Sequence, residues 1–190
     1  GLSGKFIIKR DGTVLQLPYN NVKISVVKNY SGALTDIYIK DGNGIQYTFG
    51  EGQLEQTLEH NLVNNFLQKQ NITTAWMLTR VNLPDGNLIT FDYGSLNHYV
   101  QSGVMESVRK GIVGAYCSPP PPAENISCPV DAEYSSKTSL IRYTSRYLTA
   151  INASTGPAIA IAYTDRPDAG GDNRVNLITV SNGYGTTVKK

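Results

Sequence analysis

Hydrophobic and polar residues alternate over many short stretches of the chain, and this pattern predicts β-strands. Four such stretches stand outside any longer repeat, at residues 6–10, 22–27, 142–148 and 175–180. Alternation of this kind places every second side chain on one face of a strand, where it packs toward a core. We therefore expect an all-β fold, an antiparallel sheet or meander of β-hairpins.

A longer pattern occurs three times and includes the turns between strands. Leu-Thr stands at 34, 78 and 148, with Ile or Val at the fourth position of each copy and Gly eight positions after the leucine. Aromatic or aliphatic residues follow five and seven positions beyond that glycine. A tight hairpin needs a residue with positive φ, which glycine supplies. The pattern predicts irregular hairpin repeats in one continuous sheet, with turn glycines at Gly12 (a partial copy), Gly42, Gly86 and Gly156.

Residues 58–68 fit two kinds of element. Leu54, Leu58, Leu62 and Phe66 recur every four residues, which favours one short amphipathic helix. Asn64-Asn65 and the β-rich neighbourhood favour a strand instead. Both alternatives stay open from the sequence.

We expect a single β-hairpin-repeat domain over residues 1–190, or a fragment of a larger protein. Residues 117–130 are predicted to be a Pro-rich loop insertion. Cys117 and Cys128 flank most of this loop, and a disulfide between them or two free thiols fit the sequence equally well. A zinc site is disfavoured, because the only histidines are remote in sequence.

With the repeat in view, the sequence resembles the RHS/YD-repeat family, in particular the divergent Bacteroidota-type region that precedes the regular repeats. The segments that carry the resemblance are IKDGNGIQYTFG (39–50), TAWMLTRV (74–81), LPDGNLITFDY (83–93), YLTAI (147–151), YTDRPD (163–168) and LITV (177–180).

The resemblance implies a non-enzymatic structural module of an exported or cell-surface protein, with the remainder of its own parent chain as partner. The chain lacks the Tyr-Asp-x-x-Gly-Arg run of the regular repeat and the Asp-Pro-x-Gly self-cleavage motif. A closed shell, a toxin cargo and autoproteolysis are therefore not carried over to it.

An alternative function is a carbohydrate- or protein-binding β-module. The chain has 12 tyrosines and one tryptophan, and aromatic rings on an exposed face would contact a glycan or a protein. The contact residues we expect for this alternative are Trp76, Tyr93, Tyr99 and Tyr163. Packing of the same rings within the sheet is the simpler interpretation.

Charge and composition exclude several function classes. The formal net charge is +2 and only 17% of residues are charged, so no basic stripe for nucleic acid is present. No apolar run is long enough for a transmembrane segment, and residues 1–4 do not form a signal peptide. We expect neither a nucleic-acid partner nor a transmembrane segment.

Candidate chemistry is sparse, and we expect no enzymatic activity and no cofactor. A hydrolase would need His60 or His98 beside a nucleophile, and no Gly-x-Ser-x-Gly elbow is present. Asp165, Asp168 and Asp172 are weak calcium candidates, since carboxylates suit that ion. Their spacing does not match an EF-hand, and an ion pair of Arg166 with Asp168 is the simpler interpretation.

Overall fold

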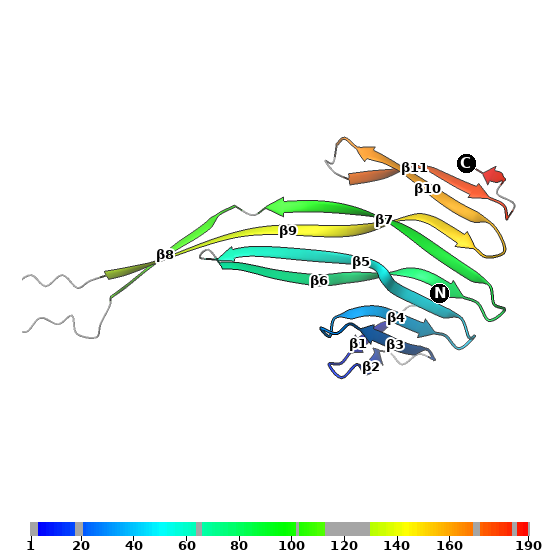
Figure 1. The fold of residues 1–190 in the computed structure, drawn as a ribbon, viewed down its shortest axis with the longest axis horizontal. Coiled ribbons are helices and arrows are strands. Elements are labelled where there is room, and N and C mark those ends of the chain that lie inside the picture. The colour runs from blue at the N-terminus through cyan, green and yellow to red at the C-terminus, as the bar shows by residue number, and fades with distance from the viewer. Residues whose placement is uncertain are drawn as a thin grey trace, which may run out of the picture. The chain divides into compact units, whose positions relative to one another are not determined.

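The chain is built entirely from β-strands over the residues that its computed structural model describes (Figure 1). These are residues 4–17, 21–63, 66–101, 103–112, 130–168, 172–183 and 186–189. The strands are β1 (Lys5–Ile8), β2 (Val14–Leu17), β3 (Lys23–Lys28), β4 (Leu34–Lys40), β5 (Gln46–Val63), β6 (Phe66–Asn82), β7 (Leu88–Gln101), β8 (Met105–Ile112), β9 (Val130–Ala153), β10 (Ala158–Arg166), β11 (Asp172–Ser181) and β12 (Thr187–Lys189).

The strands form two sheets. β1 and β2 pair as a separate hairpin, and the other strands form a 10-stranded sheet in the order β12-β11-β10-β9-β7-β6-β5-β4-β3. β8 pairs with β9 off this path, and β9 also pairs with β5. Successive strands pair antiparallel, for example β3 with β4 and β10 with β11. The predicted all-β, antiparallel hairpin fold is confirmed.

Contacts divide the chain into two compact units. The first comprises residues 1–57, 72–98 and 143–190, and the second comprises residues 58–71 and 99–142. The boundaries fall inside the long strands β5, β6, β7 and β9, so each of these strands contributes to both units. The single-domain organisation stays a prediction.

The helix considered near residues 58–68 is wrong. β5 continues to Val63 and β6 begins at Phe66, so the described residues of this stretch are strand. A spacing of four is also a multiple of two, so leucines at 54, 58 and 62 share one face of a strand as readily as one face of a helix. The antiparallel return of β6 beside β5 decides between the two.

Four hairpin turns share one hydrogen-bond pattern. In the β6–β7 turn, the Leu83 backbone N–H donates to the Asn87 carbonyl at 2.8 Å, and the Gly86 N–H donates to the Leu83 carbonyl at 3.1 Å. The turns at 9–13, 29–33 and 41–45 repeat both bonds. The fourth residue of each turn is a glycine with positive φ: Gly12 (89°), Gly32 (80°), Gly44 (85°) and Gly86 (86°).

The first repeat copy is displaced by two residues from the predicted alignment. Gly44, and not Gly42, takes the positive-φ position of the β4–β5 turn. The Asp41 carboxylate accepts hydrogen bonds from the backbone N–H groups of Asn43 and Ile45, both at 2.9 Å. These bonds hold the turn over residues 41–45, so the glycine two positions later becomes the one that must be left-handed.

The second and third copies agree in register. Val81 pairs with Ile89 across β6 and β7, and Ile151 pairs with Ile159 across β9 and β10. In both pairs the first residue lies five positions before the turn glycine, Gly86 or Gly156, and the second lies three positions after it. The prediction of equivalent hairpins holds for these two copies.

The carbonyl of each repeat leucine accepts a hydrogen bond from an aromatic side chain. The Tyr93 hydroxyl donates to the Leu78 carbonyl at 2.8 Å, and the Tyr163 hydroxyl donates to the Leu148 carbonyl at 2.7 Å. The Leu34 carbonyl accepts instead from Trp76 Nε1 at 3.2 Å, which joins β6 to β4 across the intervening β5. Burial raises the pKa of Tyr93.

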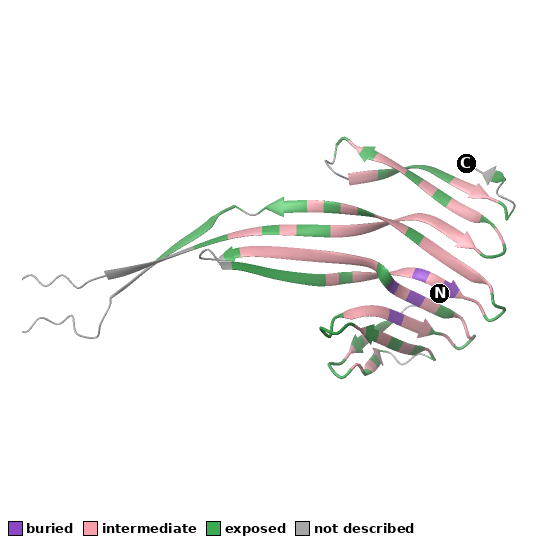
Figure 2. Ribbon diagram, viewed as in Figure 1, coloured by how far each residue is buried: buried purple, intermediate pink, exposed green. Residues whose placement is uncertain are grey.

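The best-buried part of the chain lies in β4, β5 and β6 (Figure 2). Ile37 and Val81 are the buried hydrophobic residues among those described, and Thr48 and Thr79 are the buried polar ones. Ile37 stands in a cross-strand row with Val26 of β3 and Phe49 of β5. The core is therefore a narrow strip on the sheet.

Replacing Tyr93 or Tyr163 with Phe is expected to lower the free energy of unfolding by about 0.5–1.5 kcal/mol each. Each change removes one hydrogen bond from a tyrosine hydroxyl to a strand carbonyl. Chemical denaturation followed by circular dichroism measures the effect. Tyr30→Phe is the control, because that side chain is fully exposed. Equal stabilities for all three variants would contradict this role for the hydroxyls.

The β6–β7 turn is expected to weaken in acid. A backbone hydrogen bond from Asn87 holds the pKa of Asp85 below its ordinary value of 3.8. Because the folded-state pKa is the lower one, the stabilisation is complete above about pH 5, well above the unfolded-state pKa, and is lost as the pH falls through the folded-state value. Carboxyl titration by NMR should give a pKa below 3.8 for Asp85. The Asp85→Asn variant should lose less stability than the unchanged chain between about pH 5 and about pH 2. An Asp85 pKa above 3.8 would refute the role given to the Asn87 hydrogen bond.

Candidate functional site

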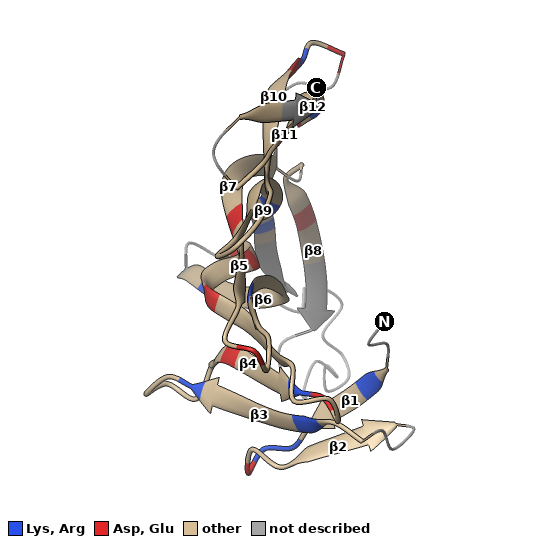
Figure 3. Cartoon of the chain, turned by 90° about the vertical axis from the view of Figure 1, so that its right-hand side faces the viewer, with Lys and Arg blue, Asp and Glu red and all other residues tan. Residues whose placement is uncertain are grey.

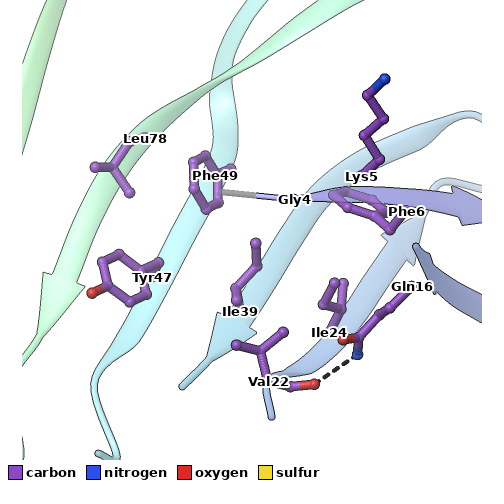
Figure 4. A pocket seen from close by; sticks show the side chains of 10 residues that line it. All are labelled: Gly4, Lys5, Phe6, Gln16, Val22, Ile24, Ile39, Tyr47, Phe49 and Leu78. Carbon is purple, nitrogen blue, oxygen red and sulfur yellow. Dashed lines mark hydrogen bonds between the residues drawn. The ribbon is translucent and has the colours of Figure 1, made fainter. Parts of the chain in front are cut away.

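An apolar cavity of about 310 Å³ lies in the first unit, between the β1–β2 hairpin and one face of the large sheet (Figure 4). The sheet contributes side chains from β3, β4, β5 and β6, and the hairpin contributes Phe6 and Gln16. Ile24, Ile39 and Tyr47 form a cross-strand row on its floor, since Ile39 pairs with both of the others.

Alternation in the hairpin explains which of its side chains cover the sheet. Phe6 and Gln16 are cross-strand partners and are half-buried, whereas Ile7 and Leu15 pair on the opposite face and are exposed. Gln16 Nε2 donates to the Val22 carbonyl at 2.7 Å (Figure 4). This bond fixes the hairpin to the residue that precedes β3.

The cavity offers apolar contact and little acid–base chemistry. Its lining includes the rings of Phe6, Tyr47 and Phe49, and its volume is near the lower end of about 300–1,000 Å³ that is usual for small-molecule sites. Lys5 also belongs to the lining, and its side chain points away from the aromatic rings (Figure 4). The simplest account of the space is a loosely filled core between two sheets.

A polar cluster lies farther along β5, where the strand departs from regular geometry. Glu51 has a φ of 47° between Gly50 at 101° and Gly52 at 80°. Its backbone N–H donates to Asp36 Oδ1 at 2.6 Å. A left-handed residue other than glycine in a strand is strained and needs such support.

The Glu51 side chain joins β5 to β6. Its carboxylate accepts a hydrogen bond from Thr79 Oγ1 at 2.7 Å and forms an ion pair with Arg80. Thr79 Oγ1 also lies 3.1 Å from the Thr48 carbonyl oxygen. On the other side, Gly50 lets β5 approach β4 closely, because a Cβ there would lie 2.3 Å from the Thr35 carbonyl oxygen.

Arg146 ties β9 to the same part of β5. Its guanidinium donates from Nε to the Leu54 carbonyl at 3.1 Å and from Nη2 to the Gly52 carbonyl at 3.2 Å. The Arg146 backbone N–H donates to Glu55 Oε1 at 3.1 Å. Glu51 and Glu55 therefore have separate structural partners.

A second cavity, of about 260 Å³, opens beside this cluster. Glu51 and Gln53 of β5, Thr79 and Arg80 of β6, and Thr90, Phe91 and Asp92 of β7 line it. Gln53 Oε1 is buried and has no hydrogen-bond partner among the described residues. Buried polar atoms are almost always satisfied in native proteins, so an orphan calls for a partner.

The aromatic residues expected to bind a ligand do not form one cluster. Trp76, Tyr93 and Tyr163 are half-buried, and their polar atoms bond to leucine carbonyls of the sheet. Tyr99 is 64% exposed and belongs to the second unit. Tyr163 packs instead against Tyr147, with ring centroids 4.7 Å apart in an edge-on arrangement.

Two of the three aspartates considered for calcium, Asp168 and Asp172, pair with Arg166, whereas Asp165 stands opposite Asn173 in the β10–β11 register. Arg166 Nη2 is 2.9 Å from Asp168 Oδ2, and its Nη1 is 3.6 Å from Asp172 Oδ2. This contact raises the pKa of Arg166 and lowers that of Asp168. The predicted Arg166–Asp168 ion pair is present. Within the described ranges, no group of three or more His, Cys, Asp or Glu side chains is arranged to hold a metal.

The remaining candidates are separated or undescribed. His60 belongs to the second unit and His98 to the first. Cys117, Cys128 and most of the Pro-rich loop at 117–130 lie outside the described residues. Basic residues stand at the two ends of the edge strand β3, Lys23 and Lys28 (Figure 3). Lysine at such positions discourages pairing with another sheet edge.

The polar cluster is the feature that the sequence analysis missed. The signal for it was the Gly-Glu-Gly run at 50–52, since glycines inside a strand pattern often mark a bulge or a close backbone approach.

No family model, no curated protein and no solved structure matches the chain. In the part of the chain that is described, no helix has the length and apolar composition needed to span a membrane.

Filling the apolar cavity is expected to stabilise the chain. Val22→Ile adds one methylene group facing the space, which should raise the free energy of unfolding by up to about 0.8 kcal/mol. Val27→Ile is the matched control, because Val27 is 43% exposed. Thermal and chemical denaturation of both variants measure the difference. A loss of stability in Val22→Ile would show that the space is already closely packed.

Proposed function

We propose that the chain is a non-enzymatic structural module, an antiparallel β-hairpin sheet whose apolar surfaces are covered by further β-hairpins of its own parent chain. The observation that carries this proposal is the exposed apolar face of the β1–β2 hairpin. Ile7, Leu15 and Leu17 are 53%, 45% and 47% exposed, and Ile7 pairs directly with Leu15.

The second unit supports the same proposal. None of its residues for which burial is described is buried. Eight large hydrophobic residues among them are exposed: Leu62, Leu67, Tyr99, Val100, Val104, Met105, Val108 and Leu140. Hairpins without a core of their own are marginally stable in water and gain stability by packing on another layer. A covering layer would supply that packing.

A β-hairpin is the covering element that suits these surfaces. The outer face of the β1–β2 hairpin carries alternating apolar side chains, and sheets pack face to face through such side chains at a separation of about 10 Å. In the second unit the exposed hydrophobic residues occur on both faces, as Tyr99 and its neighbour Val100 show. The resemblance to RHS/YD-repeat proteins supports a parent chain that contains such hairpins. The same resemblance supports an exported or cell-surface location.

The arrangement of titratable side chains gives an enzyme little support. His60 and His98 belong to different units, and no hydrogen bond of either imidazole is present within the described residues. The carboxylates of the polar cluster are held by Arg80, by Thr79 and by backbone groups. These side chains connect neighbouring strands, which is the role expected of them in a structural module.

The alternative, a binding module that uses Trp76, Tyr93, Tyr99 and Tyr163, has weaker support. Three of these residues already contribute their polar atoms to the sheet. The exposed Tyr99 remains compatible with contact to a protein surface.

The double change Ile7→Lys and Leu15→Lys tests whether a layer covers the hairpin. In the isolated 190-residue chain, the variant should keep its stability within about 0.5 kcal/mol, because both side chains are exposed. In the full-length parent protein, the lysines would be buried unpaired, and resistance to limited proteolysis should fall.

Asn43→Lys is the control, since Asn43 is an exposed polar residue of a turn. It should be tolerated in both settings. If the double variant is tolerated as well in the parent as in the isolated chain, no layer covers this face.

A further inference from the structure

We propose that the layer covering the outer face of the β1–β2 hairpin is acidic, with an apolar residue between two carboxylates on the strand that lies along β1. This inference rests on the function proposed above, because it requires that a layer of the parent chain covers the hairpin. It adds the chemistry by which the hairpin recognises that layer. The observation behind it is the order of charged and apolar side chains on the outer face.

The outer face has an apolar centre and a lysine near each end of β1. Alternation places Lys5 and Ile7 of β1, and Lys9 directly after it, on this face, and all three are exposed. Ile7 pairs with Leu15, and Lys5 pairs with Leu17. The two lysines are four residues apart in sequence, which is about 13 Å along a strand. Ile7 stands halfway between them.

Positive charge is concentrated in this part of the chain (Figure 3). Residues 1–28 hold five Lys or Arg against one Asp, a net charge of +4, whereas residues 29–190 hold 12 Lys or Arg against 14 Asp or Glu, a net charge of −2. Among the described residues, neither Lys5 nor Lys9 forms an ion pair. The hairpin therefore presents uncompensated cations beside its exposed aliphatic side chains.

Two hydrogen bonds hold the hairpin on the large sheet. Gln16 Nε2 donates to the Val22 carbonyl at 2.7 Å, and Lys28 Nζ donates to the Arg10 carbonyl at 3.1 Å. The first bond lies near the open end of the hairpin and the second at its turn, so the outer face has a fixed orientation. Charged groups on such a face set the register of a partner and exclude partners of the same charge.

A layer packed on this face would take the ammonium groups of Lys5 and Lys9 partly out of water. A charge that loses its water needs a partner of opposite sign, and a carboxylate is the protein group that supplies it. Strand side chains at i, i+2 and i+4 share one face, and aligned packed sheets keep their strand directions within about 30° of each other. Carboxylates at i and i+4 with an apolar residue at i+2 therefore match Lys5, Lys9 and Ile7.

An anionic membrane is the other kind of surface that cations and aliphatic side chains can meet. Proteins that lie on a membrane commonly place aromatic rings at its interface. No aromatic side chain lies on the outer face of the described hairpin, since Phe6 points toward the large sheet and lines the apolar cavity there. The observations therefore favour a protein layer.

Charge reversal in the full-length parent protein tests the proposal. Lys5→Glu with Lys9→Glu would place like charges opposite each other, and limited proteolysis by an enzyme that cleaves at neither lysine nor glutamate should become about fivefold faster or more. The isolated 190-residue chain should be digested at the same rate with and without the two changes. Lys23→Glu with Lys40→Glu is the matched control, because these two exposed lysines pair with each other across β3 and β4. It should be tolerated in both settings.

Comparison with the Ile7→Lys and Leu15→Lys double variant separates this inference from the proposed function. If that variant exposes the parent protein to proteolysis and the charge reversal does not, the face is covered by a layer that is not acidic, and only this inference fails. If both variants are tolerated in the parent protein, no layer covers the face, and both proposals fail.

Zero-length cross-linking identifies the partner directly. A carbodiimide joins a lysine amine to a carboxylate in contact with it through an amide bond. In the parent protein, mass spectrometry should show Lys5 or Lys9 linked to an Asp or Glu outside the 190-residue chain. Absence of such a link would overturn the proposal. Sedimentation of the isolated chain with phosphatidylglycerol vesicles that depends on Lys5 and Lys9 would also overturn it, in favour of a membrane.

Discussion

The position of the left-handed glycine in the four hairpin turns that share one hydrogen-bond pattern controls the strand register around them. A shift of strand pairing by one residue would move every side chain to the other face of the sheet. The turns prevent this, because two backbone hydrogen bonds and one positive-φ glycine fix where the chain reverses. Once Gly44 is fixed, Ile39 must pair with Tyr47, and the apolar row beneath the β1–β2 hairpin follows. Register rather than a large core holds the chain in one fold.

Such a sheet can form with few buried residues, but it leaves much apolar surface in contact with water. The described core contains Ile37 and Val81 as its buried hydrophobic residues, while the outer face of the β1–β2 hairpin exposes Ile7, Leu15 and Leu17. Exposed apolar residues are ordinary when scattered, and they indicate an interaction surface when they adjoin one another. The direct pairing of Ile7 with Leu15 is adjacency of this kind. The edge strand β3 has a lysine at each end, and these charges discourage another strand from pairing along that edge. A partner would therefore pack on a face of the sheet and not extend it at the edge.

The sequence was sufficient for the fold class and for two of the three repeat copies, because alternation and turn glycines are local signals. It failed where long-range contacts decide. The period of four at Leu54, Leu58 and Leu62 suits a helix or a strand, and only the return of β6 beside β5 distinguishes them. One local feature was missed as well: the turn was predicted at Gly42, whereas hydrogen bonds to the Asp41 carboxylate hold it over residues 41–45 and give Gly44 the positive φ. The polar cluster escaped because Glu51 meets Arg80 and Asp36 from strands far apart in sequence.

The cluster around Glu51 also separates two explanations of an irregular strand. A scaffold needs a bulge only to bend the sheet, and glycines alone would provide it at lower cost. Here the left-handed conformation falls on Glu51 as well, and Gln53 Oε1 nearby is buried without a partner. Interactions with Asp36, Thr79 and Arg80 stabilise the left-handed conformation of Glu51. No group among the described residues forms a hydrogen bond with Gln53 Oε1. The contacts of Glu51 therefore do more than bend the sheet, because they tie β5 to β4 and to β6 at the point where the strand loses its regular geometry.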